Sequence, residues 1–211
     1  MRRIPLSRRS HVIGFQPLAT GTAEHESALE RDFVTRTSFL HPAASVVSQP
    51  LTLKYSDGIR SRRYTPDFLV RYGVGHARLV EVKYRNDLRC NWQRYLPGFT
   101  AAKAWAREHG SVFRIATERH IRDGLLENAK RLLPLRHSEI DTEVGRRLVG
   151  VIRDQRSPTF GNVIERGSVD RAAAVATLWR LIAHGTVRVD LHSPITLHTA
   201  LRLHEPAAPT A

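Results

Sequence analysis

Apolar positions near the start of the chain change from a helical spacing to the alternation typical of strands. Residues 24–40 carry apolar side chains three or four positions apart, which predicts an amphipathic helix that ends before Pro42. Turn signals at 56–58 and 73–75 then divide a region rich in β-branched and aromatic residues. We expect three strands there, paired as an antiparallel meander. They cover residues 46–55, with a break at Pro50, residues 62–72 and residues 77–84.

Helical and strand patterns alternate again after the third strand. Residues 86–96 are polar and basic and predict a loop or a short helix, whereas residues 97–109 predict a helix with one apolar face. A short strand at 112–117 and a further helix ending near Pro134 follow. This order of elements predicts an α/β core with an α/β/α arrangement over residues 24–134, which is a reasonable size for one domain.

A second, smaller domain is expected at 135–204. Helical patterns at 140–152 and 169–184 enclose a shorter helix, and residues 186–191 and 195–197 predict a β-hairpin. Three helices followed by a hairpin is the element order of a winged-helix domain, a variant of the helix-turn-helix. The sequence therefore predicts a small C-terminal winged-helix-like domain.

The two ends of the chain differ from these domains in composition. Residues 1–23 are basic and lack periodicity, which is compatible with an arm that orders on the domain or on DNA, or with a plain flexible terminus. Residues 205–211 are rich in proline and alanine and predict a disordered tail. Neither end is expected to contribute to the core.

Charge and cysteine content narrow the classes of function. The formal net charge is +13, and arginine, whose planar fork suits phosphate, carries most of it. This charge favours nucleic acid as the partner. A single cysteine, Cys90, excludes an internal disulfide, makes a thiolate-rich zinc site very improbable and favours the cytoplasm. No apolar run approaches the length of a membrane span, so no membrane partner is expected.

Charged residues inside the expected strands are the main candidates for chemistry. In the third strand, alternation places Glu81 and Lys83 on one face, while Val80 and Val82 can enter the core. Asp67 lies on the preceding strand, across a short turn, within reach of Glu81. Two carboxylates this close repel each other, and a divalent cation removes the conflict. Oxygen ligands of this kind suit Mg²⁺, or Mn²⁺ as a substitute.

A Pro-Asp pair, thirteen further residues and then Glu-x-Lys is the signature of restriction-endonuclease-like nucleases of the PD-(D/E)xK type. Lys83 is suited to orient a water molecule and to stabilise charge on the phosphate, and the carbonyl of Val82 is a further candidate metal ligand. Glu30, on the preceding helix, is the candidate fourth group, with Glu26 in reserve one turn earlier. The alternative is an edge strand whose solvated face carries Glu81 and Lys83.

Four sequence blocks together resemble the TnsA family, the endonuclease subunits of heteromeric, Tn-seven-type transposases that include CRISPR-associated ones. The blocks are residues 25–33, 48–50, 64–70 and 80–83. By this resemblance Glu30, Asp67, Glu81 and Lys83 would form the catalytic set, and the first three would bind the metal. The resemblance implies cleavage of the 5′ ends of a transposon in double-stranded DNA, in the bacterial cytoplasm at the nucleoid.

The same resemblance implies partners, namely an integrase-type transposase subunit like TnsB and an AAA+ regulator like TnsC, with the C-terminal part of the family contacting TnsC and DNA. Candidate DNA contacts on this chain are Arg62, Arg63, Arg85 and Gln93, for which surface solvation is the alternative. Gln49 reaches the site or simply caps a strand. Two other functions stay open: a stand-alone restriction or repair nuclease, and a winged-helix DNA-binding protein with an inactive nuclease domain.

Overall fold

A computed structural model describes residues 14–18, 21–56, 58–167 and 170–204. The chain divides into two compact units, Met1–Arg122 and Asp123–Ala211. The division falls before helix α4 (Gly124–Leu132), whereas the sequence placed the domain boundary after that helix, at 134/135. Most of the expected arm and the whole expected tail lie outside the described residues. Among the residues that are described, no helix has the length and apolarity needed to cross a membrane.

A four-stranded sheet forms the centre of the first unit, in the order β3-β6-β7-β8. Its strands are β3 (Ser45–Ser48), β6 (Phe68–Arg71), β7 (Ala77–Val82) and β8 (Ser111–Ala116). Strand β6 pairs antiparallel with β3 and β7, but β7 and β8 are parallel. A parallel pair needs a long crossover, which helix α2 (Arg85–Glu108) supplies. The first unit is therefore a mixed α/β fold and not a simple meander.

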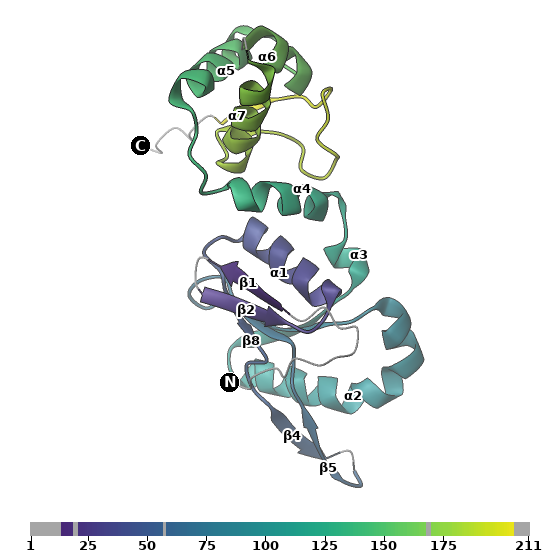
Figure 1. The fold of residues 1–211 in the computed structure, drawn as a ribbon. Coiled ribbons are helices and arrows are strands. Elements are labelled where there is room, and N and C mark those ends of the chain that lie inside the picture. The colour runs from purple at the N-terminus through teal and green to yellow at the C-terminus, as the bar shows by residue number, and fades with distance from the viewer. Residues whose placement is uncertain (1–13, 19–20, 57, 168–169, 205–211) are drawn as a thin grey trace. The chain divides into compact units, whose positions relative to one another are not determined.

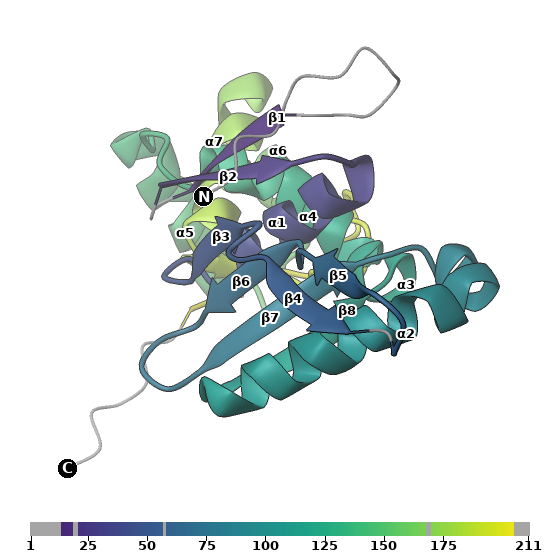
Figure 2. The same cartoon turned by 90° about the horizontal axis from the view of Figure 1, so that it is seen from below.

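Helix α1 (Ala28–Leu40) and helix α2 lie on opposite faces of this sheet (Figure 2). On the α1 face, Phe33 stacks on Phe68 with ring centroids 5.3 Å apart. On the α2 face, the buried side chains of the sheet and the helix form one cluster, which contains Leu69, Leu79, Ala102 and Ala106. Successive side chains of β6 and β7 thus point to opposite faces of the sheet and pack into two cores, one on each side. This confirms a layered α/β arrangement.

Of the two alternatives for residues 86–96, the helix is correct, and it joins the helix expected at 97–109, so that α2 begins at Arg85. The polar side chains in this stretch bind one another. The Asp87 carboxylate accepts hydrogen bonds from Asn91 Nδ2 at 2.7 Å and from Tyr95 Oη at 2.9 Å. These bonds span a kink, where Asn91 departs from helical geometry at φ −120° and ψ 17°. Asp87 therefore holds the two parts of α2 together.

In the described residues of the first unit, two further strand pairs lie outside the central sheet (Figure 1). Strands β1 (Gly14–Leu18) and β2 (Gly21–His25) form a hairpin in a region that the sequence assigned to the arm and to the start of α1. Strands β4 (Leu53–Ser56) and β5 (Ser61–Tyr64) form a second hairpin. The break expected at Pro50 is thus present, and the strand expected at 62–72 is also divided, near Pro66, because proline cannot donate to a strand ladder.

The short helix α3 (Glu118–Ile121) ends the first unit. After α4 and a 3-10 turn (Leu133–Leu135), the second unit contains three helices and two short strands. They are α5 (Thr142–Asp154), α6 (Phe160–Gly167), α7 (Arg171–Ala183), β9 (Val187–Arg188) and β10 (Arg202–Leu203). Leu148, Ile164 and Leu178, one from each helix, are fully buried. Three helices and a strand pair keep the expected order, and the winged-helix assignment stays a prediction.

The expected return strand at 195–197 is wrong, because β9 pairs with residues 202–203 instead. Asn128 on α4 explains the difference. Its side-chain Nδ2 donates to the carbonyls of Leu191 and Ser193, at 2.8 and 2.9 Å. These bonds hold the segment after β9 against α4, so it cannot turn directly into a second strand.

Candidate active site

Glu81 and Lys83 meet at the carboxyl end of β7. Glu81 is only 3% exposed, and its Oε1 lies 2.8 Å from Lys83 Nζ. The alternation predicted for this strand therefore places both side chains on one face, the face that α2 covers. Burial alone would lower the pKa of Lys83, but the charges of Asp67 and Glu81 outweigh it and raise that pKa above its usual range. Lys83 accordingly stays charged beside a buried carboxylate.

Asp67 is attached to the same strand from the side. It follows Pro66 just before β6, and its Oδ2 accepts a hydrogen bond from the Val82 backbone N–H at 2.7 Å. Val82 stands between Glu81 and Lys83, so this bond places Asp67 beside both of them. Burial and the negative charge of Glu81 raise the pKa of Asp67 well above its usual range, although Lys83 opposes them. The two carboxylates of Asp67 and Glu81 therefore carry more negative charge than the one ammonium group of Lys83 neutralises.

Tyr64 is a site residue that the sequence reasoning missed. Its Oη donates to Glu81 Oε2 at 2.6 Å, opposite the contact that Lys83 makes to Oε1. Tyr64 is the last residue of β5, outside the central sheet, and its ring packs against α2, where a Cβ on Gly98 would come within 3.1 Å of Tyr64 Cγ. Burial and then Glu81 raise the pKa of Tyr64, so the hydroxyl remains a donor. Its place three residues before Asp67 is the one signal in the sequence.

Glu30 is used to begin helix α1. Its backbone N–H donates to the N-cap Ser27 Oγ at 3.2 Å, and its carboxylate accepts from Ser27 Oγ at 2.8 Å and from the Glu26 N–H at 2.7 Å. The charge of Glu30 still contributes to the raised pKa of Asp67. Within the described part of the chain, however, no three His, Cys, Asp or Glu side chains are grouped to hold a metal ion. Glu30 and Glu81 both act electrostatically on Asp67, and the metal site expected from the three carboxylates stays a prediction.

Gln49 links the start of α1 to Asp67. Its backbone N–H donates to the Asp67 carbonyl at 2.7 Å, and its side-chain Nε2 donates to Glu26 Oε1 at 2.8 Å. Among non-glycine residues that the structure describes, Gln49 alone has a positive φ, at 43°. A strained backbone of this kind persists only where its surroundings fix it. Gln49 thus belongs to the framework that positions the carboxylates, and Glu26 is bound to it.

The candidate DNA contacts lie on exposed surfaces at two places. Arg62 and Arg63 are on β5, where Arg63 stands directly across from Lys54 of β4. Two like charges in a directly opposed pair destabilise a hairpin, so an anionic partner would relieve them. Arg85 is the first residue of α2 and Gln93 lies further along the same helix, both exposed. All four residues are thus exposed, and their contact with DNA stays a prediction.

Comparison with protein families finds one match. Residues 43–118 match the family described as TnsA-like endonuclease N terminal, whereas no curated protein matches the chain. The matched segment contains Asp67, Glu81 and Lys83 together with Tyr64, the groups that the structure joins by hydrogen bonds and an ion pair. Glu30 and the second unit lie outside it. The match over residues 43–118 confirms the resemblance of this chain to the TnsA family.

Proposed function

We propose that this protein is a divalent-metal-dependent DNA endonuclease that cuts the 5′ ends of a transposon as one subunit of a heteromeric transposase. The observation that carries the proposal is the contact of Lys83 Nζ with the buried Glu81, at 2.8 Å, beside an Asp67 with a raised pKa. Burying a cluster of carboxylates and one lysine costs folding free energy, and such clusters are common at functional sites. The match of residues 43–118 to an endonuclease family, a segment that contains these residues, supports the proposal.

The donor set fits a hard cation. Asp67, Glu81 and the carbonyl of Val82 offer oxygen ligands, and burial together with the charge of Glu81 raises the pKa of Asp67. These three groups would hold Mg²⁺ or Mn²⁺, and Glu30 would complete the set if its carboxylate left the cap. When bound, the ion polarises the phosphate and acidifies a water molecule.

The residues of the chain have separate tasks in phosphodiester hydrolysis. Lys83 donates hydrogen bonds and carries the positive charge that stabilises the phosphate oxygens as negative charge grows on them. Tyr64 fixes the orientation of the Glu81 carboxylate through its bond to Oε2. The Val82 N–H does the same for Asp67. Water attacks phosphorus, and the phosphorus–oxygen bond to the leaving strand breaks as that oxygen gains a proton.

Strand-specific mapping of DNA ends tests the proposal. The purified protein is incubated with transposon-end DNA, an integrase-type transposase subunit, an AAA+ regulator and Mg²⁺. We expect new 5′-strand cuts at the transposon ends only in the complete mixture, and none when EDTA replaces Mg²⁺. Equal cutting by the protein alone would instead indicate a stand-alone nuclease, and no cutting in any mixture would contradict the endonuclease function.

Replacing Tyr64 by phenylalanine is expected to weaken cleavage while the fold is kept. The variant loses only the hydroxyl that donates to Glu81 Oε2, and the ring can still pack against Phe99, 5.9 Å away between centroids. Loss of a hydrogen bond that orients a metal ligand typically costs about 10- to 100-fold in metal affinity or activity. Cleavage rates measured over a range of Mg²⁺ concentrations should show a higher requirement for Mg²⁺. An unchanged requirement would show that Tyr64 has no such role.

A further inference from the structure

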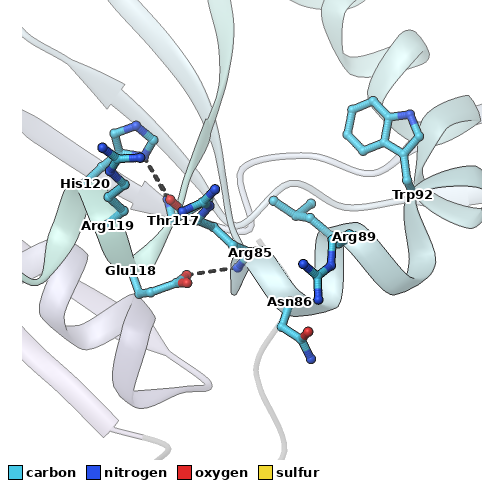
Figure 3. Close-up of a pocket in the computed structure, with 9 residues that line it drawn as sticks. Arg85, Asn86, Arg89, Trp92, Thr117, Glu118, Arg119 and His120 are labelled. Atoms are coloured by element: carbon cyan, nitrogen blue, oxygen red, sulfur yellow. Dashed lines mark hydrogen bonds between the residues drawn. The ribbon is translucent and has the colours of Figure 1, made fainter.

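A hollow of about 910 Å³ opens beside the candidate active site, between the start of α2 and the turn from β8 to α3 (Figure 3). Arg85, Arg89 and Trp92 line it from α2, and Arg119 and His120 line it from α3. The hollow lies at the carboxyl ends of β7 and β8, which are parallel and next to each other. Ligands of open α/β sheets bind in this position, outside the carboxyl ends of parallel strands.

The positive charge around this hollow is not neutralised. Arg85, Arg89 and Arg119 are exposed, and within the described residues no ion pair joins them to a carboxylate. The acidic residues nearby have other partners. Glu118 Oε2 accepts from the Arg85 backbone N–H at 2.9 Å, and Asp87 binds Asn91 and Tyr95. Three guanidinium groups are therefore free to donate to phosphate oxygens, often in pairs.

Trp92 gives the same hollow an aromatic wall. Its side chain is 42% exposed, which is unusual for so large an apolar ring, and Figure 3 shows it across the hollow from Arg119. Its contact with Phe99 has centroids 5.9 Å apart and rings inclined by 62°, so the indole is held without being stacked. An exposed indole beside arginines is the combination that proteins use to bind single-stranded nucleic acid.

We propose that this hollow binds one unpaired nucleotide of the DNA strand next to the cleaved phosphate, with its phosphate on the arginines and its base stacked on Trp92. The proposal rests on the proposed endonuclease function. Lys83 precedes Arg85 by two residues, so their Cα atoms are at most about 8 Å apart, or roughly two nucleotide steps along a strand. A paired base shows only its edges to a protein, whereas an unpaired base offers the face that stacking requires.

Binding without cleavage tests the arginines. Two fluorescent duplexes of the same sequence, one blunt and one with a three-nucleotide single-stranded extension, are titrated in EDTA by fluorescence anisotropy. We expect the wild-type protein to prefer the extended duplex by about tenfold, the usual size for one stacked base. Arg89→Ala/Arg119→Ala should lose this preference, and its plot of log K against log salt should be flatter by about 1.4, the value for two phosphates of a single strand.

Arg107→Ala is the matched control for the arginine variant. Arg107 is exposed on the same helix α2 and does not line the hollow. Its replacement should keep both the preference and most of the salt dependence. If the double variant behaves like this control, the proposal is overturned, and an acidic protein segment becomes the alternative occupant. The proposal would also be overturned if the double variant lost the same affinity for the blunt and the extended duplex, because the hollow would then contact only the backbone of paired DNA.

Two substitutions at Trp92 separate stacking from packing. Trp92→Phe keeps an aromatic face, whereas Trp92→Leu keeps an apolar side chain near Phe99 but cannot stack on a base. We expect Trp92→Phe to retain most of the preference for the extended duplex and Trp92→Leu to lose it, with both thermal midpoints close to the wild type. If Trp92→Phe and Trp92→Leu showed the same preference for the extended duplex, the proposal that a base stacks on Trp92 would be overturned. Because these titrations contain no metal, their failure leaves the end-mapping result unaffected, and a failure of end mapping leaves these titrations interpretable.

Discussion

Lys83→Ala should reduce the rate of 5′-strand cleavage by at least about 100-fold, the usual cost of removing one group that stabilises developing charge. Lys83 Nζ lies 2.8 Å from the buried Glu81, and the nearby carboxylates keep its pKa raised, so the ammonium group is charged at any working pH. The two other lysines of residues 43–118 are not placed to replace Lys83. Lys54 lies on the β4–β5 hairpin, and Lys103 is exposed on α2. Single-turnover cleavage in the complete mixture measures the loss.

Two further variants make this result specific. Lys103→Ala removes an exposed lysine of the same unit and should cleave at the wild-type rate. Lys83→Arg keeps the charge but replaces a compact ammonium by a planar fork, so it should remain strongly impaired. A thermal melt of each variant shows whether the fold survives. Wild-type cleavage by a folded Lys83→Ala protein would prove the site assignment wrong.

The strands that carry the chemistry were predictable because their pattern is local. Alternation alone places Glu81 and Lys83 on one face of β7, and the structure joins them directly. The first half of α2 was less predictable, because its polar residues were compatible with a loop as well as with a short helix. Their hydrogen bonds to Asp87 compensate for the missing apolar face, and they are visible only once the helix exists.

The environment of the carboxylates depends on contacts between distant segments. Tyr64 reaches Glu81, seventeen residues later, because its ring packs against α2 at Gly98. No periodicity encodes this contact. Glu30 shows the opposite case, since Ser27 followed three residues later by Glu30 is a sequence signature of a capping box. That local signal was available, and it explains why the carboxylate binds Ser27 and the Glu26 N–H.

Asp67→Asn should make the metal-free protein more stable while it abolishes cleavage. The pKa of Asp67 is raised in the folded state, so its contribution to stability is greatest below the pKa of an unfolded aspartate and is lost as the pH rises toward the folded value. At neutral pH, where an unfolded aspartate is ionised, the raised pKa of Asp67 therefore opposes folding. Asparagine removes this charge, and its side-chain oxygen can still accept from the Val82 N–H. We expect a gain of about 1 kcal/mol, or roughly 2–4 °C in a melt in EDTA.

Mg²⁺ should reverse the order of the melting temperatures, so that the wild type becomes more stable than Asp67→Asn. A cation that binds only the folded state stabilises it in proportion to its occupancy, so the wild-type melting temperature should rise with Mg²⁺ while that of Asp67→Asn should change little. Glu108→Gln removes an exposed acid of the same unit and should follow the wild type in both buffers. A lower melting temperature for Asp67→Asn in EDTA would mean that Asp67 serves the fold. A higher melting temperature for Asp67→Asn in EDTA, together with the lost response to Mg²⁺, would mean that Asp67 destabilises the fold and serves to bind the metal.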